Sequence, residues 1–166
     1  TVLDLGAGHG RNSAFLATHG FVATAVELET VDVERLREKS VRAGLSITVI
    51  QADIAEFITS SMFDVILANH SLHFCAPESI DVVFERMKNM TNPGGLHVVS
   101  GYTSRNPKGL RPYLFNTDEL LRRYQGWEIL YYTQDANGHP SVTPKAPKDN
   151  GPEARYITEI IAQKPL

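Results

Sequence analysis

VLDLGAGHG, residues 2–10, opens the 166-residue chain with an apolar tetrapeptide and three glycines at alternate positions. The apolar run at residues 2–5 predicts a buried strand, and a helix is expected from about Arg11 to His19, where Gly20 can end it. Glycines between a strand and a helix let the backbone turn sharply and approach a ligand closely at the carboxyl end of a parallel sheet. A tight turn without any ligand is the alternative explanation of this pattern taken alone.

The chain beyond this turn alternates between apolar strands and amphipathic helices. Strands are expected at residues 21–27, 47–50, 63–68 and 96–100. Helices are expected across Val33–Ala43 and from Pro77 through Met90, with a turn at Asn92-Pro93-Gly94-Gly95. Because short apolar strands separated by helices favour parallel pairing, the sheet should be mainly parallel, with helices on both of its faces.

The last part of the chain has a different pattern. Thr117-Asp118-Glu119 predicts the start of a helix, and strands at 127–132 and 155–162 follow with no helix between them, which predicts an antiparallel hairpin. The proline-rich segment Gln134–Glu153 is expected to be a long mobile loop. We therefore expect one α/β domain over residues 1–166, and because the chain starts without methionine and directly in a strand, we expect a preceding segment in the whole protein.

Composition excludes several classes of protein. The 42% hydrophobic and 21% charged fractions are typical of a globular domain rather than a disordered, collagen-like or coiled-coil chain. The single cysteine, Cys75, excludes an intrachain disulfide and a multi-cysteine metal site, and is typical of the reducing cytoplasm. A net charge of −3 argues against a nucleic-acid or membrane-surface partner, and no apolar run is long enough to span a bilayer.

Acidic residues at three successive strand ends accompany the glycine turn. Glu27 closes the second expected strand, where a carboxylate in doubly wound folds accepts hydrogen bonds from ribose hydroxyls. Asp53 follows the third strand and could accept from an adenine amino group, or could instead cap a helix. A dinucleotide fingerprint would place its third glycine at Arg11, and no Gly-Lys-Ser/Thr ending is present, so the spacing disfavours NAD and excludes a P-loop. With Asp4, these positions predict a nucleoside site.

The order of these motifs closely resembles class I S-adenosylmethionine-dependent methyltransferases. The motifs that carry the resemblance are VLDLGAGHG (2–10), Glu27, QADI (51–54), FDVILAN (63–69) and NPGGLHVV (92–99). The resemblance implies a Rossmann-like, mostly parallel sheet in the order 3-2-1-4-5-7-6, with the last strand antiparallel. It also implies S-adenosyl-L-methionine as the cofactor. The residues implied around it are Gly6, Ala7 and Gly8 beside the methionine moiety, Asn69 facing it, Glu27 at the ribose, Asp53 and Ile54 at the adenine, and Asp4, which either holds the glycine turn or contacts the amino group indirectly.

A narrower resemblance concerns three other segments. GRNSAFLATHGF (10–21), FNTDELLRRYQGWEILYY (115–132) and AQKP (162–165) resemble the TehB-type tellurite-resistance methyltransferases. This resemblance implies a small-molecule or oxyanion acceptor, such as tellurite or selenite, rather than a protein or nucleic acid.

Methyl transfer from a sulfonium is a displacement in which the cofactor itself carries the activation. The protein mainly brings the reactants together in line, an effect that can supply about 7–11 kcal/mol, so no metal is expected. His70 is the candidate base, and Arg11 is the candidate for holding an anionic acceptor. Ordinary surface or packing roles are the alternatives for both. His73 is a second candidate base. Arg105, Lys108 and Arg111 are further candidates for attracting an anion.

The acceptor is expected at the loop of residues 69–74, with Arg11 on one side and the loop of residues 100–113 on the other. Two other classes of function stay open at this point. One is a non-catalytic domain that binds the cofactor, and the other, less favoured, is a nicotinamide-dependent reductase.

Overall fold

The computed structural model describes residues 1–106, 111–134 and 156–166. The elements in chain order are β1 (Val2–Leu5), α1 (Arg11–Thr18), β2 (Ala23–Glu27), α2 (Thr30–Ala43), β3 (Ile47–Gln51), β4 (Phe63–Asn69), the short 3₁₀-helices η1 (Leu72–Phe74) and η2 (Pro77–Ser79), α3 (Ile80–Asn89), β5 (Thr91–Tyr102), α4 (Glu119–Arg123), β6 (Glu128–Gln134) and β7 (Ile157–Gln163). The expected Gln134–Glu153 loop lies outside the described residues, except for Gln134, which ends β6.

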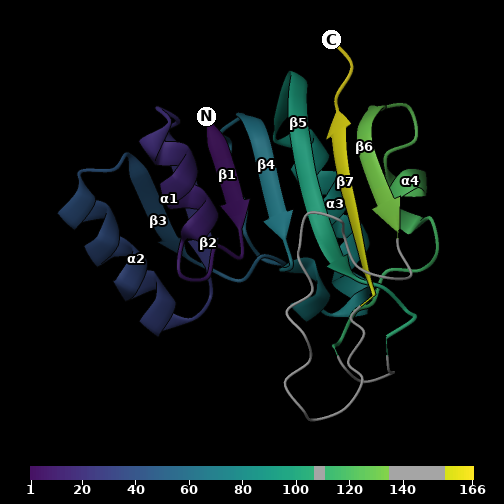
Figure 1. Ribbon diagram of the computed structural model, residues 1–166, viewed down its shortest axis with the longest axis horizontal. Coiled ribbons are helices and arrows are strands. Elements are labelled where there is room, and N and C mark those ends of the chain that lie inside the picture. Colours follow the sequence, from purple (N-terminus) through teal and green to yellow (C-terminus); the bar gives the residue numbers. More distant parts are fainter. Residues whose placement is uncertain (107–110, 135–155) are drawn as a thin grey trace, which may run out of the picture.

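One seven-stranded sheet, in the order β3-β2-β1-β4-β5-β7-β6, organises the molecule (Figure 1). The five strands from β1 to β5 pair in parallel, whereas β7 is antiparallel to both β5 and β6. Figure 1 shows α1 in front of this sheet and α3 behind it, so helices cover both faces. The predicted strand order and the predicted terminal hairpin are therefore confirmed. The parallel strands bring the ends of β1, β2, β3, β4 and β5 to one edge.

The core forms where the sequence predicted apolar faces. All four residues of β1 are buried, as a strand covered on both faces requires. In α3 the apolar positions at spacings of three and four, Ile80, Val83, Phe84 and Met87, are buried against the sheet. Burying each such side chain contributes about 1.5–3 kcal/mol. β1 and β4 are neighbours in the inner part of the sheet, so the loops that follow them begin at paired strands on both sides.

The turn expected at residues 92–95 lies inside β5, which begins at Thr91. Phe63 pairs with Thr91 and Val65 with Leu96, so β5 contains extra residues that β4 does not match. Gly94, with φ of +73°, lies in this irregular stretch. The composition thus indicated a real bend, but because backbone pairing resumes at Leu96 the bend interrupts a strand rather than preceding one.

Several element boundaries also differ from the sequence prediction, among them the starts of β2 and α4. The second strand begins at Ala23 rather than at position 21, and the exposed Phe21 and Val22 precede it. The helix expected at Thr117 begins at Glu119, because Asp118 has a left-handed φ of +54° and cannot be part of a right-handed helix. In the described part of the chain no helix has the length and apolarity needed to cross a membrane.

Candidate active site

The turn after β1 is built from three glycines that all adopt a positive φ: Gly6 (+72°), Gly8 (+54°) and Gly10 (+70°). A Cβ atom on Gly6 would lie 2.4 Å from the Cβ of Ser71, and one on Gly10 would lie 2.0 Å from Leu36 Cδ1. A Cβ on Gly8 would meet no atom within 4 Å. Gly6 and Gly10 therefore allow close packing against the loop after β4 and against α2, whereas Gly8 borders open space where a ligand can lie.

Asp4 supports this turn from inside the protein. Its side chain is buried, and Oδ2 accepts hydrogen bonds from the Ser13 backbone N–H at 3.1 Å and from the Ser13 hydroxyl. Burial raises the pKa of the Asp4 carboxyl, and the bonds from Ser13 oppose this shift. Asp4 therefore fastens β1 to the start of α1.

Glu27 joins the end of β2 to the same turn. Its Oε2 accepts from the Gly8 N–H at 2.7 Å, and its Oε1 accepts from the N–H groups of Leu28 and Glu29 at 2.8 and 2.9 Å. An ionised carboxylate has about four lone-pair sites, so three backbone bonds leave accepting capacity for a hydroxyl. Glu27 is thus held in a fixed position with an acceptor still available beside Gly8.

The end of β3 supplies Asp53 and Ile54. Asp53 Oδ1 accepts a hydrogen bond from the Ala55 N–H at 2.8 Å and so closes a turn. No helix follows this turn, so Asp53 is not the helix cap that the sequence left open as an alternative. A Cβ on Gly6 would lie 3.2 Å from Ile54 Cδ1, which places this side chain against the glycine turn. The structure therefore brings Glu27 and Ile54 to the same glycine turn, Glu27 at Gly8 and Ile54 at Gly6.

The loop after β4 is fastened to β5. Asn69 Oδ1 accepts from the Ser100 hydroxyl, and the His70 N–H donates to Ser100, with distances of 3.1 Å to the backbone oxygen and 3.2 Å to Oγ. His70 has a φ of +53°, a conformation that costs a non-glycine residue about 1–3 kcal/mol and persists only where its surroundings impose it. The backbone of the predicted base is therefore fixed at the edge where β4 and β5 end.

Two buried polar atoms in this loop have no hydrogen-bond partner among the described residues: Ser71 Oγ and His73 Nδ1. Both side chains are almost fully buried, at 4% and 2% exposure, and an unsatisfied buried group costs about 1–3 kcal/mol. Ser71 also lies directly against Gly6. These unsatisfied atoms indicate a site that a ligand completes. Ser71 was not among the site residues expected from the sequence, although the loop that contains it was expected at the acceptor.

Aromatic rings and a guanidinium surround His73. Its ring stacks on the Tyr102 ring, with 4.6 Å between the ring centres, and its centre lies 4.5 Å from that of Phe74. The centres of the His70 and Tyr102 rings are 5.4 Å apart. The Arg111 guanidinium carbon lies 4.9 Å from the centre of the Phe74 ring. Burial first, and then the charges of His70 and Arg111, lower the pKa of His73 to about 4, so this imidazole is neutral at physiological pH.

The basic residues that were expected to hold the acceptor lie in different parts of the structure. Arg11 begins α1 with an exposed side chain and forms no hydrogen bond or ion pair with any described side chain. Arg105 stacks on the Tyr156 ring at 4.5 Å, and position 108 lies outside the described residues. Of the basic residues that the sequence analysis named in the loop after β5, the structure therefore brings only Arg111 to the loop that carries His70.

Cys75 closes this loop and is buried. Burial, with a smaller contribution from the charge of Asp53, raises the pKa of its thiol to about 11. Across the described ranges no cluster of three or more His, Cys, Asp or Glu side chains is arranged to hold a metal ion.

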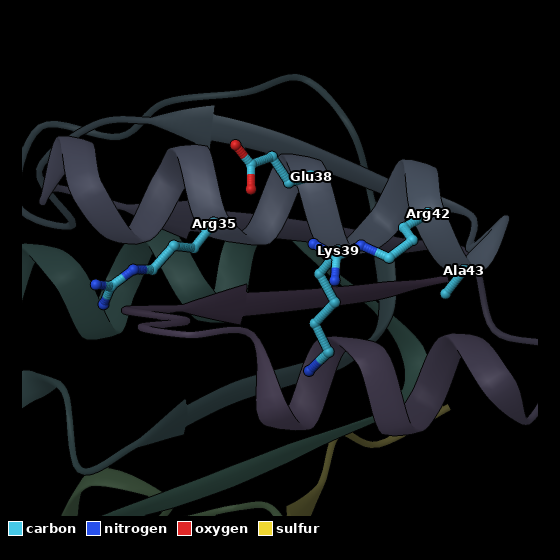
Figure 2. A pocket seen from close by; sticks show the side chains of 5 residues that line it. All are labelled: Arg35, Glu38, Lys39, Arg42 and Ala43. Carbon is cyan, nitrogen blue, oxygen red and sulfur yellow. The ribbon is translucent and has the colours of Figure 1, made fainter.

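A hollow of about 420 Å³ lies along α2, away from these loops (Figure 2). Figure 2 shows Lys39 extending toward α1, with Glu38 pointing the other way. All of its lining residues, Arg35, Glu38, Lys39, Arg42 and Ala43, are exposed. No buried polar group faces it, so this hollow is an ordinary surface feature and the edge beside Gly8 remains the candidate site.

Comparisons with known proteins show which family the chain is similar to. The family described as Tellurite resistance protein TehB matches residues 1–143. A probable S-adenosyl-L-methionine-dependent methyltransferase TehB from Haemophilus influenzae is 29% identical over 137 residues, which cover 81% of this chain and 48% of the relative. Hemagglutinin 1 of Eikenella corrodens is 28% identical over 174 residues, covering 98% of this chain and 54% of that protein. The chain thus spans about half the length of these relatives.

A solved structure gives the same result for the fold. The crystal structure of TehB from Haemophilus influenzae superposes with a TM-score of 0.86 at 26% identity, covering 98% of this chain and 57% of that chain. The similarity covers nearly the whole chain and shows that the seven-stranded fold is shared.

Proposed function

The chain belongs to the TehB family and has the class I methyltransferase fold, and from this premise we propose that it transfers a methyl group from S-adenosyl-L-methionine to a small anionic acceptor. The observation that carries the proposal is the pairing of an open glycine turn, held by Glu27, with a loop whose buried Ser71 hydroxyl lacks a partner among the described residues. A cytoplasmic location belongs to the proposal, since the single cysteine suits a reducing compartment.

The residues at the turn fit the cofactor. Gly8 borders open space, Glu27 keeps accepting capacity for ribose hydroxyls, and Ser71 supplies an unused hydroxyl beside Gly6. In this proposal the cofactor is held by Gly6, Ala7 and Gly8 at the methionine moiety, Asn69 facing it, Glu27 at the ribose, Asp53 and Ile54 at the adenine, with Asp4 fixing the turn from behind. The three carboxylates among these residues, Asp4, Glu27 and Asp53, each accept a hydrogen bond from a backbone N–H group in the structure.

When bound, S-adenosyl-L-methionine supplies a methyl group on a sulfonium sulfur: a lone pair of the acceptor forms the bond to the methyl carbon while the carbon–sulfur bond breaks and its electron pair stays on sulfur. The loop from Asn69 to Phe74 contacts the glycine turn, where Ser71 lies against Gly6, and is fastened to Ser100, so in this proposal it orients the acceptor. His70 either positions the acceptor or takes a proton from it. A compact oxyanion with a lone pair, such as tellurite or selenite, requires only the positioning.

Calorimetric titration and a methyl-transfer assay test this function. We expect S-adenosylhomocysteine to bind and to raise the melting temperature, while NADH does neither. Labelled cofactor should pass its methyl group to selenite or tellurite. Stabilisation by NADH alone would contradict the assignment, and binding without transfer to any anionic or thiol acceptor would favour a non-catalytic cofactor-binding domain.

A further inference from the structure

We infer that Arg111 and His73 together bind the anionic acceptor and so determine which acceptors the protein takes. The inference concerns the cluster of His70, His73, Phe74, Tyr102 and Arg111, called here the His73 cluster. It rests on the proposed function, because it names the residues that hold the acceptor for that reaction.

The strands place the His73 cluster beside the cofactor turn. Asn69 pairs with Ser100 near the ends of the parallel strands β4 and β5, so His70 and Tyr102 come to the same edge of the sheet. Between His70 and His73 lies Ser71, whose Cβ approaches the position of a Gly6 Cβ to 2.4 Å. The cluster therefore borders the turn at the place where an acceptor must meet the methyl group.

Arg111 provides the positive charge of the cluster. Its guanidinium carbon lies 4.9 Å from the centre of the Phe74 ring and 5.8 Å from the centre of the Tyr102 ring. Contact with two rings orients the plane of a guanidinium, whose N–H donors lie around its edge and match the geometry of an oxyanion. An arginine held in this way binds a compact anion with direction, which an exposed arginine such as Arg11 does not.

His73 adds a neutral polar atom to that charge. The side chain is 2% exposed, and Nδ1 has no hydrogen-bond partner among the described residues. The groups that face it are Tyr102, stacked at 4.6 Å, His70 at 6.0 Å between ring centres, and the Arg111 charge. A neutral imidazole offers one donor and one acceptor, so it can bind either an oxyanion oxygen or the hydroxyl of its protonated form. A buried nitrogen without a partner is explained if the acceptor occupies this position.

The test uses sodium selenite as the probe and needs no turnover. The protein is saturated with S-adenosylhomocysteine, and selenite is titrated while the histidine ring signals are followed by NMR. We expect selenite to shift the His73 signals. Loss of a charge-assisted bond in Arg111→Gln should weaken selenite binding by about tenfold to a hundredfold, with His73→Gln weaker than wild type and Arg111→Lys between wild type and Arg111→Gln.

Controls separate this inference from the proposed function. Arg42→Gln removes an exposed arginine of α2 and should bind selenite like the wild type, and all variants should bind S-adenosylhomocysteine with unchanged affinity. In the methylation assay Arg111→Gln should raise KM for selenite far more than it lowers kcat. Wild-type selenite affinity in both Arg111→Gln and His73→Gln, or unshifted His73 signals, would overturn the inference. Failure of methyl transfer with selenite still bound at His73 would overturn the proposed function alone.

Discussion

The two sides of the candidate site are held by different kinds of contact. On the cofactor side, Glu27 accepts three backbone N–H bonds and Asp4 accepts two bonds from Ser13, so the geometry is set by the main chain. On the acceptor side, stacked rings surround His73, and its buried Nδ1 lacks a partner among the described residues. The first side is thus held by hydrogen bonds to the main chain, whereas the second is held by packed rings and keeps a polar atom that the proposed acceptor would satisfy.

The largest expected effect is on the contact between the two sides. Gly6→Ala would place a Cβ 2.4 Å from the Ser71 Cβ, at a φ of +72°. Overpacking and left-handed strain together should lower the free energy of unfolding by about 2–4 kcal/mol and abolish binding of S-adenosylhomocysteine. Urea denaturation and calorimetry measure both. Gly8→Ala is the matched control, because it meets open space and should lose only about 1–2 kcal/mol. Equal losses would mean that the packing of Gly6 on Ser71 is unimportant.

The cofactor side alone is tested by Glu27→Gln. An amide keeps the shape of the side chain but loses the charge and one of the two accepting oxygens that hold the Gly8, Leu28 and Glu29 N–H groups. The Kd for S-adenosylhomocysteine should rise by about tenfold to a hundredfold. Calorimetric titration measures this, with circular dichroism to check the fold. If the affinity is unchanged, Glu27 only holds the turn and does not meet the ribose.

The acceptor side alone is tested by pH. The pKa of His73 is lowered from its ordinary value to about 4 in the folded protein, mainly by burial, so the unfolded chain binds more protons between about pH 6.5 and 4. The stability that His73 contributes is therefore complete above pH 6.5 and is lost as the pH falls. Between pH 7.5 and 5.0 this loss amounts to about 2 kcal/mol.

Urea denaturation of the wild type and of His73→Gln at these two pH values measures this contribution. The variant should lose about 2 kcal/mol less than the wild type. His97, which is buried between Thr91 and Tyr124 and has its pKa lowered to about 3, acts equally in both proteins. Parallel losses in the two proteins would show that His73 is exposed to water in solution.

The smallest effect is expected for Arg11→Gln. Its side chain is exposed and makes no hydrogen bond or ion pair with the described side chains, so the free energy of unfolding should change by less than about 0.5 kcal/mol. The KM for selenite should change less than in Arg111→Gln. A larger increase in KM for Arg11→Gln would return the acceptor to the position that the sequence analysis expected.

The same contrast explains how much of the site could be predicted from the sequence. The glycine turn with Gly6 and Gly8, and the position of Glu27 at a strand end, follow from local rules, because turn geometry and strand ends are encoded over a few residues. The order of the strands was expected from the family resemblance. The cluster around His73 combines η1, the end of β5 and Arg111, which come together only when β4 and β5 pair. No local pattern marks Tyr102 as the ring on which His73 stacks. The residues that meet at the glycine turn could therefore be named from the sequence, whereas the cluster around His73 could be named only in part.

The burial of Cys75 bears on whether the proposed methyl donor could alkylate the protein itself. A thiolate near a sulfonium methyl group would itself be alkylated, since the thiolate is the reactive form of cysteine. Burial and a thiol pKa of about 11 keep Cys75 protonated and out of reach, although it immediately follows Phe74 of the acceptor loop. Under the proposed function this burial would keep Cys75 from being methylated, and intact mass spectrometry after prolonged turnover should find the chain unmodified.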